Sequence, residues 1–294
     1  MTGLQARAAP ALRGMLWMAA SGALFVVLNT IMKKLAHDLD PWQVGFLRYF
    51  LGALVMLVPV LRLGARALWP KVQKLQLARS VFHAGGILLW FAALPLVTLA
   101  ELTAIGFSGP IFICLGAVLF LRERMSGERW AAVLVGFLGV ALVVTPWEGH
   151  GFAGISPGML LMLASAPMFA GSFLVAKVLT RHDAPGVIVL WQHLWVSLLL
   201  APFAVAGWAA LDATQWAAII VCGFLGAAGH YCMTRAFRVA DISAVQSVRF
   251  LELVWAAVLG FAVFGDVPGG WTVIGGLVIL VSTLWLARRE ARAR

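Results

Sequence analysis

Long apolar stretches dominate the chain, and polar residues gather in the short segments between them. A helix needs ~20 apolar residues to cross the hydrocarbon core of a bilayer. Stretches near that length can be placed at 15–35, 43–61, 79–95, 99–121, 130–145, 158–179, 186–206, 214–236, 241–264 and 271–287. The pattern predicts an all-α membrane protein with ten transmembrane helices.

The first and sixth of these stretches repeat one sequence. Residues 15–41 align without a gap to residues 159–185, at an offset of 144. Nine positions are identical: Met15/Met159, Leu16/Leu160, Met18/Met162, Ala20/Ala164, Ser21/Ser165, Phe25/Phe169, Lys33/Lys177, Leu35/Leu179 and Pro41/Pro185. A weak repeat of about half the chain is typical of duplicated secondary transporters, whose substrate binds between the halves. We expect two five-helix repeats, residues 1–150 and 151–294.

Composition and charge placement give the orientation of these helices. With 62% hydrophobic residues, 12% charged residues and a mean hydropathy of +0.95, the chain is too apolar for a soluble domain of 294 residues. A net charge of +10 would suggest nucleic acid as the partner of a soluble protein. Here 18 of the 22 basic residues fall on one side of the predicted helices. The positive-inside rule explains that charge and predicts cytoplasmic N- and C-termini, with no role in nucleic-acid binding.

Five helices per half is an odd number, so the second half should enter the membrane from the opposite side to the first. The two halves then form an inverted repeat, with the substrate bound near the midplane between them. Pro110 and Pro167 lie inside predicted helices, where a proline removes a backbone hydrogen bond. We expect a bend at each proline.

Several motifs recur in order along both halves. The first half carries RYFLGAL at 48–54, FAAL at 91–94 leading to Pro110, and RERMSGERWAAVLVGFLGV at 122–140. The second half carries TRAFRVADISAVQSVRFLELVWAAVLGFAVFGD at 234–266. On these motifs the chain resembles the drug/metabolite transporter superfamily, in its EamA-type branch of ten-helix bacterial carriers. Asp266 stands where the first half has Glu123, and Gln192 stands opposite Arg48, so the copies differ at charged positions.

The resemblance implies a carrier of small metabolites in the bacterial inner membrane, with neither ATP hydrolysis nor a bound cofactor. The main functional expectation is export of amino acids, including aromatic ones. Uptake of a vitamin or nucleotide-like metabolite is the alternative. We expect no enzymatic activity, because the sequence has no HExxH, GxSxG or paired carboxylates at helical spacing. A small molecule and the lipid bilayer are the expected partners, and we take a monomer as the working expectation.

The ninth predicted helix holds the densest set of polar residues. On an α-helix, Gln246, Arg249 and Phe250 share one face, while Glu252 lies about 120° away from Gln246. Arg249 either binds a substrate carboxylate or pairs with Glu252 and fixes the bundle. Gln246 has both donors and acceptors for a substrate. The first half has only Thr103 and Gly106 at the positions of Gln246 and Arg249, and we predict the substrate site at this asymmetry.

Two histidines fall inside predicted helices. His83 and His230 could carry the proton of a coupled transport cycle, or could be neutral, hydrogen-bonded interior residues. A metal site is not expected, since His230 and Cys232 are two ligands without partners.

Further candidate substrate contacts share the faces of matched helices. Trp17 and Ser21 lie on one face of the first helix, and Met168 and Ser172 lie on the corresponding region of the sixth. Trp90 and Trp255 are deep enough to form an aromatic lining. Arg48 lies about 7 Å from the predicted outer face, and we expect its side chain to extend to the headgroups.

Overall fold

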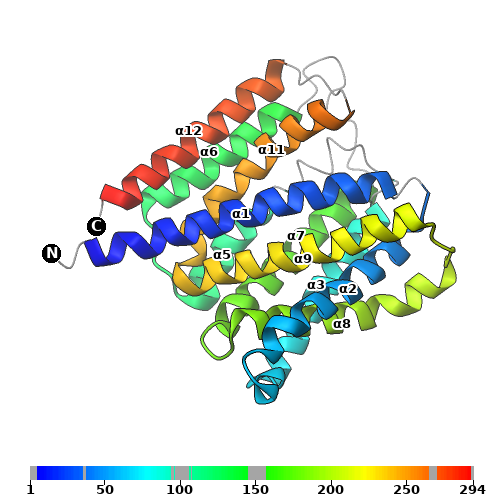
Figure 1. Ribbon diagram of the computed structural model, residues 1–294. Coiled ribbons are helices and arrows are strands. Elements are labelled where there is room, and N and C mark those ends of the chain that lie inside the picture. Colours follow the sequence, from blue (N-terminus) through cyan, green and yellow to red (C-terminus); the bar gives the residue numbers. More distant parts are fainter. Residues whose placement is uncertain are drawn as a thin grey trace.

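The computed structural model of the chain describes residues 5–35, 38–93, 96, 106, 108–144, 157–264 and 270–292, and all regular secondary structure within these ranges is helical (Figure 1). The elements are α1 (Gln5–Leu35), α2 (Pro41–Leu61), η1 (Ala65–Leu68), α3 (Gln73–Ala93), α5 (Gly109–Leu121), α6 (Gly127–Val144), α7 (Pro157–Leu179), α8 (Pro185–Ala206), α9 (Ala213–Val239), α10 (Ile242–Gln246), η3 (Ser247–Phe250), α11 (Leu251–Leu259), η4 (Gly260–Phe264) and α12 (Gly270–Arg292).

Six segments of the described chain are long and apolar enough to cross a membrane. They are Pro10–Met32, Pro41–Leu61, Pro157–Leu179, Pro185–Ala206, Ala213–Val239 and Ile242–Val263. Their outward surface is rich in exposed large apolar side chains such as Val58, Leu198 and Val205. In water such a surface would be unfavourable, whereas lipid tails cover it without cost. The predicted all-helical membrane protein is confirmed at this level.

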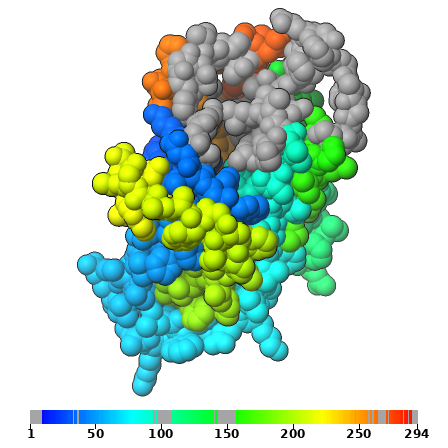
Figure 2. Space-filling view, turned by 90° about the vertical axis from the view of Figure 1, so that its right-hand side faces the viewer, coloured from blue at the N-terminus to red at the C-terminus, as the bar shows by residue number. Residues whose placement is uncertain are grey.

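Helices from the first part of the sequence pack against helices from the second part. α1 lies along α9, α3 along α7, α2 along α8, and α6 along α12. The view in Figure 2 shows the same interleaving, because blue and cyan segments lie beside yellow and green ones across one face. Each long contact therefore joins residues that are far apart in the sequence.

Local sequence signals set where the helices begin. The side chain of Asp40 accepts hydrogen bonds from the backbone N–H groups of Trp42 and Gln43, and Pro41 occupies the first turn of α2. Asp212 and Gln215 form a capping box at the start of α9. Pro185 begins α8 in the same way as Pro41 begins α2, 144 residues earlier.

The ninth predicted helix is not continuous, which corrects one expectation. α10 ends at Gln246, a 3₁₀ turn covers Ser247–Phe250, α11 follows, and Gly260–Phe264 is a π-helical turn. A 3₁₀ turn advances by 120° per residue rather than 100°. Three such steps return to the same direction, so Gln246 and Arg249 still share a face, whereas Phe250, one residue further on, turns away from it.

Pro110 and Pro167 occupy different positions in their helices. α5 begins at Gly109, so Pro110 lies in its first turn, where the missing N–H breaks no intrahelical bond. The expected bend at Pro110 stays a prediction, because residues 99–105 and 107 of that predicted helix lie outside the described residues. Pro167 lies inside α7, as predicted, and the bend there stays a prediction.

Candidate functional site

A row of glycines on α9 lets helices of the first half approach closely. A Cβ atom at Gly226 would lie 3.1 Å from Nε of Arg48, and one at Gly229 would lie 3.0 Å from the ring of Phe25. A Cβ atom at Gly223 would lie 2.7 Å from Cβ of Leu51. Small residues at this spacing form the close helix–helix contacts found in membrane bundles. They bring α1 and α2 against α9 at the middle of the bundle.

Three histidines meet at this junction. The ring centroid of His230 lies 5.2 Å from that of His83 and 5.4 Å from that of His193, and both ring pairs are nearly perpendicular. Tyr49 lies beside all three, with ring centroids 5.9 Å from His83, 5.1 Å from His193 and 6.4 Å from His230. Each of the four side chains is at most 3% exposed. They come from α2, α3, α8 and α9, so the fold rather than the local sequence assembles them.

Two arginines lie within the same group. Arg48 is 8% exposed, and its guanidinium carbon is 4.4 Å from the centroid of the Tyr49 ring. Arg79 is fully buried, and its Nη1 donates to the carbonyl of Ile188, at 3.0 Å. Arg79 lies one helical turn before His83 on α3, so the two side chains share a face of that helix. We call Arg48, Tyr49, Arg79, His83, His193 and His230 the central cluster.

Hydrogen bonds order part of the central cluster. Nη2 of Arg48 donates to Oη of Tyr49, at 3.1 Å, and Oη lies 2.8 Å from Nε2 of His83. Since the phenol accepts from Arg48, its own hydrogen is available to Nε2 of His83. A neutral His83 then carries its proton on Nδ1, which lies 3.4 Å from Oγ of Ser172. Arg48, Tyr49, His83 and Ser172 therefore form one directed chain across α2, α3 and α7.

The flanks of the central cluster show the duplication. Phe25 of α1 packs edge-on against His230, with centroids 4.9 Å apart, and Phe169 of α7 packs edge-on against His83, at 5.3 Å. These phenylalanines are 144 residues apart, at one of the identical positions of the repeat. Gly229 receives the first ring and Gly86 receives the second. The scaffold around the cluster is thus nearly symmetric.

The polar residues inside that scaffold are not symmetric. Arg48 and Tyr49 on α2 have Gln192 and His193 as their counterparts on α8, again 144 residues later. Gln192 is fully buried, and neither atom of its amide has a partner among the described residues. By contrast, the buried amide of Gln43 makes hydrogen bonds to both backbone groups of Ala209. Where α2 packs against α8, the cationic Arg48 and the aromatic Tyr49 therefore have an amide, Gln192, and an imidazole, His193, as their counterparts.

Several predicted site residues lie in or beside the central cluster. His83 and His230, selected separately from the sequence, are in direct ring contact, and Ser172 lies next to His83. Met168 lies against Gly85 of α3, one turn from Ser172. Oγ of Ser21 donates to the carbonyl of Gly229, at 2.9 Å, and so joins α1 to α9.

Arg48 corrects another expectation. Its side chain does not extend to the headgroups, because it is buried and contacts Tyr49 and Sδ of Met32. The depth estimated along one helix could not show that α9 and α1 enclose this arginine.

The Arg249–Glu252 pair lies on a different part of the bundle. Nε of Arg249 is 3.3 Å from Oε1 of Glu252, so the intrahelical pair is the arrangement present in the structure. The Arg249 guanidinium lies 5.2 Å from the ring of Phe173, whose centroid is 6.3 Å from that of His83. The pair thus borders the central cluster through one aromatic ring.

The remaining predicted contacts are spread over the bundle. Gln246 is fully buried and its amide atoms have no partner in the described part of the chain. Trp255 and Glu252 both lie against Gly22 of α1. Trp17 packs under the guanidinium of Arg235, at 5.4 Å, and Trp90 packs edge-on against Phe91, at 5.1 Å. Trp17 and Trp90 are not in the central cluster.

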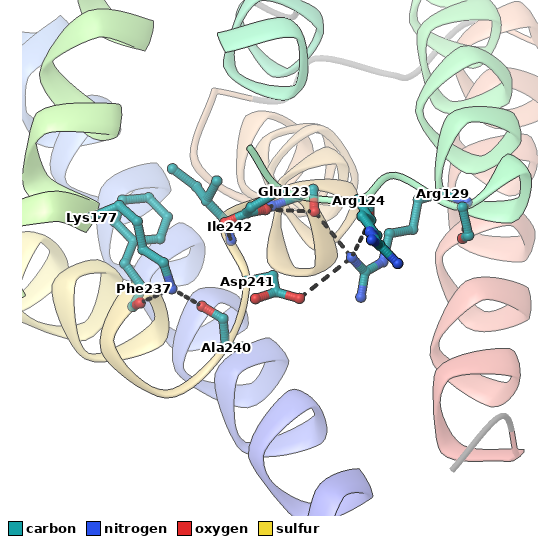
Figure 3. Close-up of polar contacts among 10 residues, drawn as sticks. Glu123, Arg124, Arg129, Lys177, Phe237, Ala240, Asp241 and Ile242 are labelled. Carbon is teal, nitrogen blue, oxygen red and sulfur yellow. Dashed lines mark hydrogen bonds and ion pairs between the residues drawn. The ribbon is translucent and has the colours of Figure 1, made fainter. Parts of the chain in front are cut away.

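A second polar group holds the corner between α9 and α10 (Figure 3). The carboxylate of Glu123, just after α5, accepts hydrogen bonds from the backbone N–H groups of Ile242 and Ser243 and from Oγ of Ser243, at 3.1, 3.2 and 2.8 Å. Nζ of Lys177 donates to the carbonyls of Phe237 and Ala240, both at 2.6 Å. Side chains from elsewhere in the chain therefore cap the end of α9 and the start of α10.

Arg129 of α6 completes this corner. Its Nη1 lies 3.5 Å from Oδ2 of Asp241 and 3.2 Å from Oγ of Ser243. The corner thus connects α5, α6, α7, α9 and α10 through polar contacts.

Sequence reasoning missed Tyr49, Arg79 and His193 as site residues. Tyr49 and His193 occupy matched positions of the repeat and differ in type, the same signal that drew attention to Arg249. No local signal distinguishes Arg79, which lies near a predicted helix end among other basic residues. The described residues contain no group of three or more His, Cys, Asp or Glu placed to hold a metal ion.

Comparisons with known proteins agree with this architecture. The sequence profile of the EamA-like transporter family matches residues 12–145 and again residues 156–288. A riboflavin transporter of Rhizobium johnstonii is 33% identical over 99% of this chain and 96% of its own length. A riboflavin transporter of Vibrio cholerae is 30% identical over 96% of this chain and 97% of its own length. An S-adenosylmethionine uptake transporter of Rickettsia prowazekii is 24% identical over 96% and 95% of the two chains.

A solved crystal structure has the same fold. It superimposes with a TM-score of 0.79 at 18% sequence identity, and the match covers 96% of this chain and 99% of that chain. At this identity the likeness concerns the fold alone.

Proposed function

This chain belongs to the EamA-like transporter family, and from that premise we propose that it takes up a flavin-type metabolite by alternating access. The observation that carries the proposal is the identity of 33% and 30%, over almost the whole chain, to two riboflavin transporters. The protein is a multi-pass protein of the bacterial inner membrane. Amino-acid export, the main expectation from the sequence, has no support from these relatives, and the alternative of vitamin uptake fits them better.

The central cluster is the proposed substrate site. It lies between helices of both halves, which is where duplicated carriers bind their substrates. Buried aromatic rings favour a planar heteroaromatic ligand. The ring nitrogens of His230 and the amide of Gln192 have no hydrogen-bond partner among the described residues, and they can therefore bind the polar edges of such a ligand. Of the residues predicted from the sequence, His83, Ser172 and His230 are proposed substrate contacts. Gln246 and Arg249 remain predicted contacts at the border of the central cluster.

The proposed mechanism is a relative movement of two repeats, residues 1–150 and 151–294, arranged as an inverted pair with cytoplasmic termini. Such a movement would expose the central cluster first to one side of the membrane and then to the other. Its energy would come from the substrate gradient or a coupled ion, and the proposal assigns no chemical reaction to the chain.

Transport in proteoliposomes tests this function. We expect the purified full-length protein to take up labelled riboflavin faster than protein-free liposomes, and excess unlabelled riboflavin to compete. Labelled tryptophan, loaded inside the same vesicles, tests amino-acid export. Labelled S-adenosylmethionine tests uptake of the substrate named for the Rickettsia prowazekii relative. If riboflavin uptake does not exceed that of protein-free liposomes, the proposed function is wrong.

A further inference from the structure

We propose that Arg48 and Arg79 bind the edge of the substrate ring system that carries carbonyl oxygens and ring nitrogens, and that the site thereby rejects cations. This inference rests on the proposed uptake of a flavin-type metabolite and names the part of the ligand that is recognised.

The two arginines carry donors that the protein leaves unused. Each guanidinium has five N–H donors and no acceptor. Nε of Arg48 has no partner in the described structure, and neither Nε nor Nη2 of Arg79 has one. The contacts that do exist are few: Arg48 reaches Tyr49 and the weak acceptor Sδ of Met32, and Arg79 reaches the carbonyl of Ile188. Buried donors without acceptors are costly, and a ligand rich in acceptors would remove that cost.

The charge of the central cluster is also uncompensated. Ion pairs elsewhere in the described chain include those of Arg129 with Asp241, Arg249 with Glu252, and Arg289 with Glu128. Neither Arg48 nor Arg79 has a carboxylate partner there. Asp183, in the segment between α7 and α8, accepts hydrogen bonds from Gln76 and from the backbone N–H of Lys71 instead. A buried arginine is normally paired, so partial negative charge from the ligand is the missing partner.

The arrangement of the central cluster gives the ligand a direction. Both arginines come from the first half, on α2 and α3, whereas α8 and α9 contribute His193, Gln192 and His230 without a fixed positive charge. A flavin has the complementary polarity, because its dioxopyrimidine ring concentrates acceptors at one end and its dimethylbenzene ring is apolar. The acceptor end would face α2 and α3. A sulfonium or ammonium group placed there would meet two buried cations.

A pair of flavins that differ in one atom tests the recognition. In 1-deazariboflavin a C–H group replaces the acceptor N1, while the shape of the ring system is retained. We expect the wild-type protein to transport riboflavin at least about tenfold more efficiently than 1-deazariboflavin, as for loss of one charge-assisted hydrogen bond. S-adenosylmethionine in excess should not inhibit riboflavin uptake. Equal efficiency for the two flavins would overturn the inference without any mutation.

Substitutions then test whether Arg48 and Arg79 are the residues that recognise this edge of the flavin. We expect Arg48→Gln or Arg79→Gln to bring the ratio of the two flavin efficiencies close to one, and Arg48→Lys to keep part of it. A purely structural role would lower uptake of both flavins and leave the ratio unchanged, and that result in both Gln variants would contradict the inference. Arg66→Gln is the matched control, because Arg66 is exposed in η1 and should leave rate and ratio unchanged.

These outcomes are separable from failure of the proposed function. If the wild-type protein does not transport riboflavin, the function itself is wrong. If it transports riboflavin and ignores the N1 substitution, the function stands and recognition by the arginines is wrong.

Discussion

The phenol oxygen of Tyr49 lies 2.8 Å from Nε2 of His83, and this contact joins α2 to α3 at the centre of the bundle. The same oxygen accepts a hydrogen bond from Arg48. One hydroxyl group therefore serves as the acceptor for a buried cation and as the donor to a buried imidazole.

Tyr49→Phe should destabilise the protein by about 1–3 kcal/mol, because two buried polar groups lose their partner while the ring is retained. The measurement is thermal unfolding of the purified protein in detergent, followed by tryptophan fluorescence. Tyr231→Phe on α9 is the matched control, since the hydroxyl group of Tyr231 makes no hydrogen bond within the described residues. Equal melting temperatures for the two variants would show that the Tyr49 hydroxyl is not a structural link.

Much of the fold follows from the sequence because it depends on local patterns. Stretches of apolar residues predict the long helices, and Asp40, Pro41 and Pro185 lie at the helix starts that the structure shows. The break at Ser247–Phe250 could not be predicted in this way. Four residues are too few for the spacing of apolar positions to distinguish a 3₁₀ turn from an α-helix. In the structure this turn packs against α1, α6 and α12.

The site depends on contacts between distant helices, and so only parts of it could be predicted. His83 and His230 are visible as polar residues in apolar stretches, but their separation of 5.2 Å depends on how α3 and α9 pack. The expectation that differences between the repeats mark the substrate site was applied to Gln246 and Arg249. The same comparison at Arg48/Gln192 and Tyr49/His193 points to the central cluster, once α2 and α8 are known to lie side by side.

Gly52 is a second test of the close packing at this junction. A Cβ atom at Gly52 would collide with the imidazole ring of His193 and would lie 3.2 Å from the carbonyl oxygen of Gly223. We expect Gly52→Ala to destabilise the protein by about 1–3 kcal/mol through overpacking, and to lower riboflavin uptake by displacing His193. Gly276→Ala on α12 has open space around the new methyl group and should be neutral or slightly stabilising. Thermal unfolding and proteoliposome uptake of both variants give the comparison, and a neutral Gly52→Ala would contradict the close contact.

Glu123 tests the corner between α9 and α10. Its carboxylate accepts three hydrogen bonds, two of them from the first backbone N–H groups of α10. Glu123→Ala should cost about 1–3 kcal/mol of stability, because a charged acceptor is removed from donors that have no partner within so short a helix. Glu123→Gln should cost less, since one side-chain oxygen remains.

The control for this prediction is Glu128→Ala, which removes a carboxylate from a solvent-exposed pair with Arg289. Exposed pairs contribute about 0–1 kcal/mol, so this variant should unfold near the wild-type temperature. If both alanine variants lose the same stability, the hydrogen bonds of Glu123 to α10 are not the reason.

The pair of Arg249 and Glu252 can be tested as a structural unit rather than as two separate substrate contacts. Both side chains are partly buried, with 22% and 17% of their surface exposed, so removing one charge leaves the other poorly solvated. We expect Arg249→Gln and Glu252→Gln each to destabilise the protein by about 1–3 kcal/mol. The double variant should be more stable than the sum of the two losses predicts, because neither charge is then left alone. If Arg249 instead holds the substrate directly, Arg249→Gln should abolish riboflavin uptake, and the double variant, although stable, should not recover it. Measuring unfolding and uptake on the same four proteins therefore decides between the two roles that the sequence allowed for this arginine.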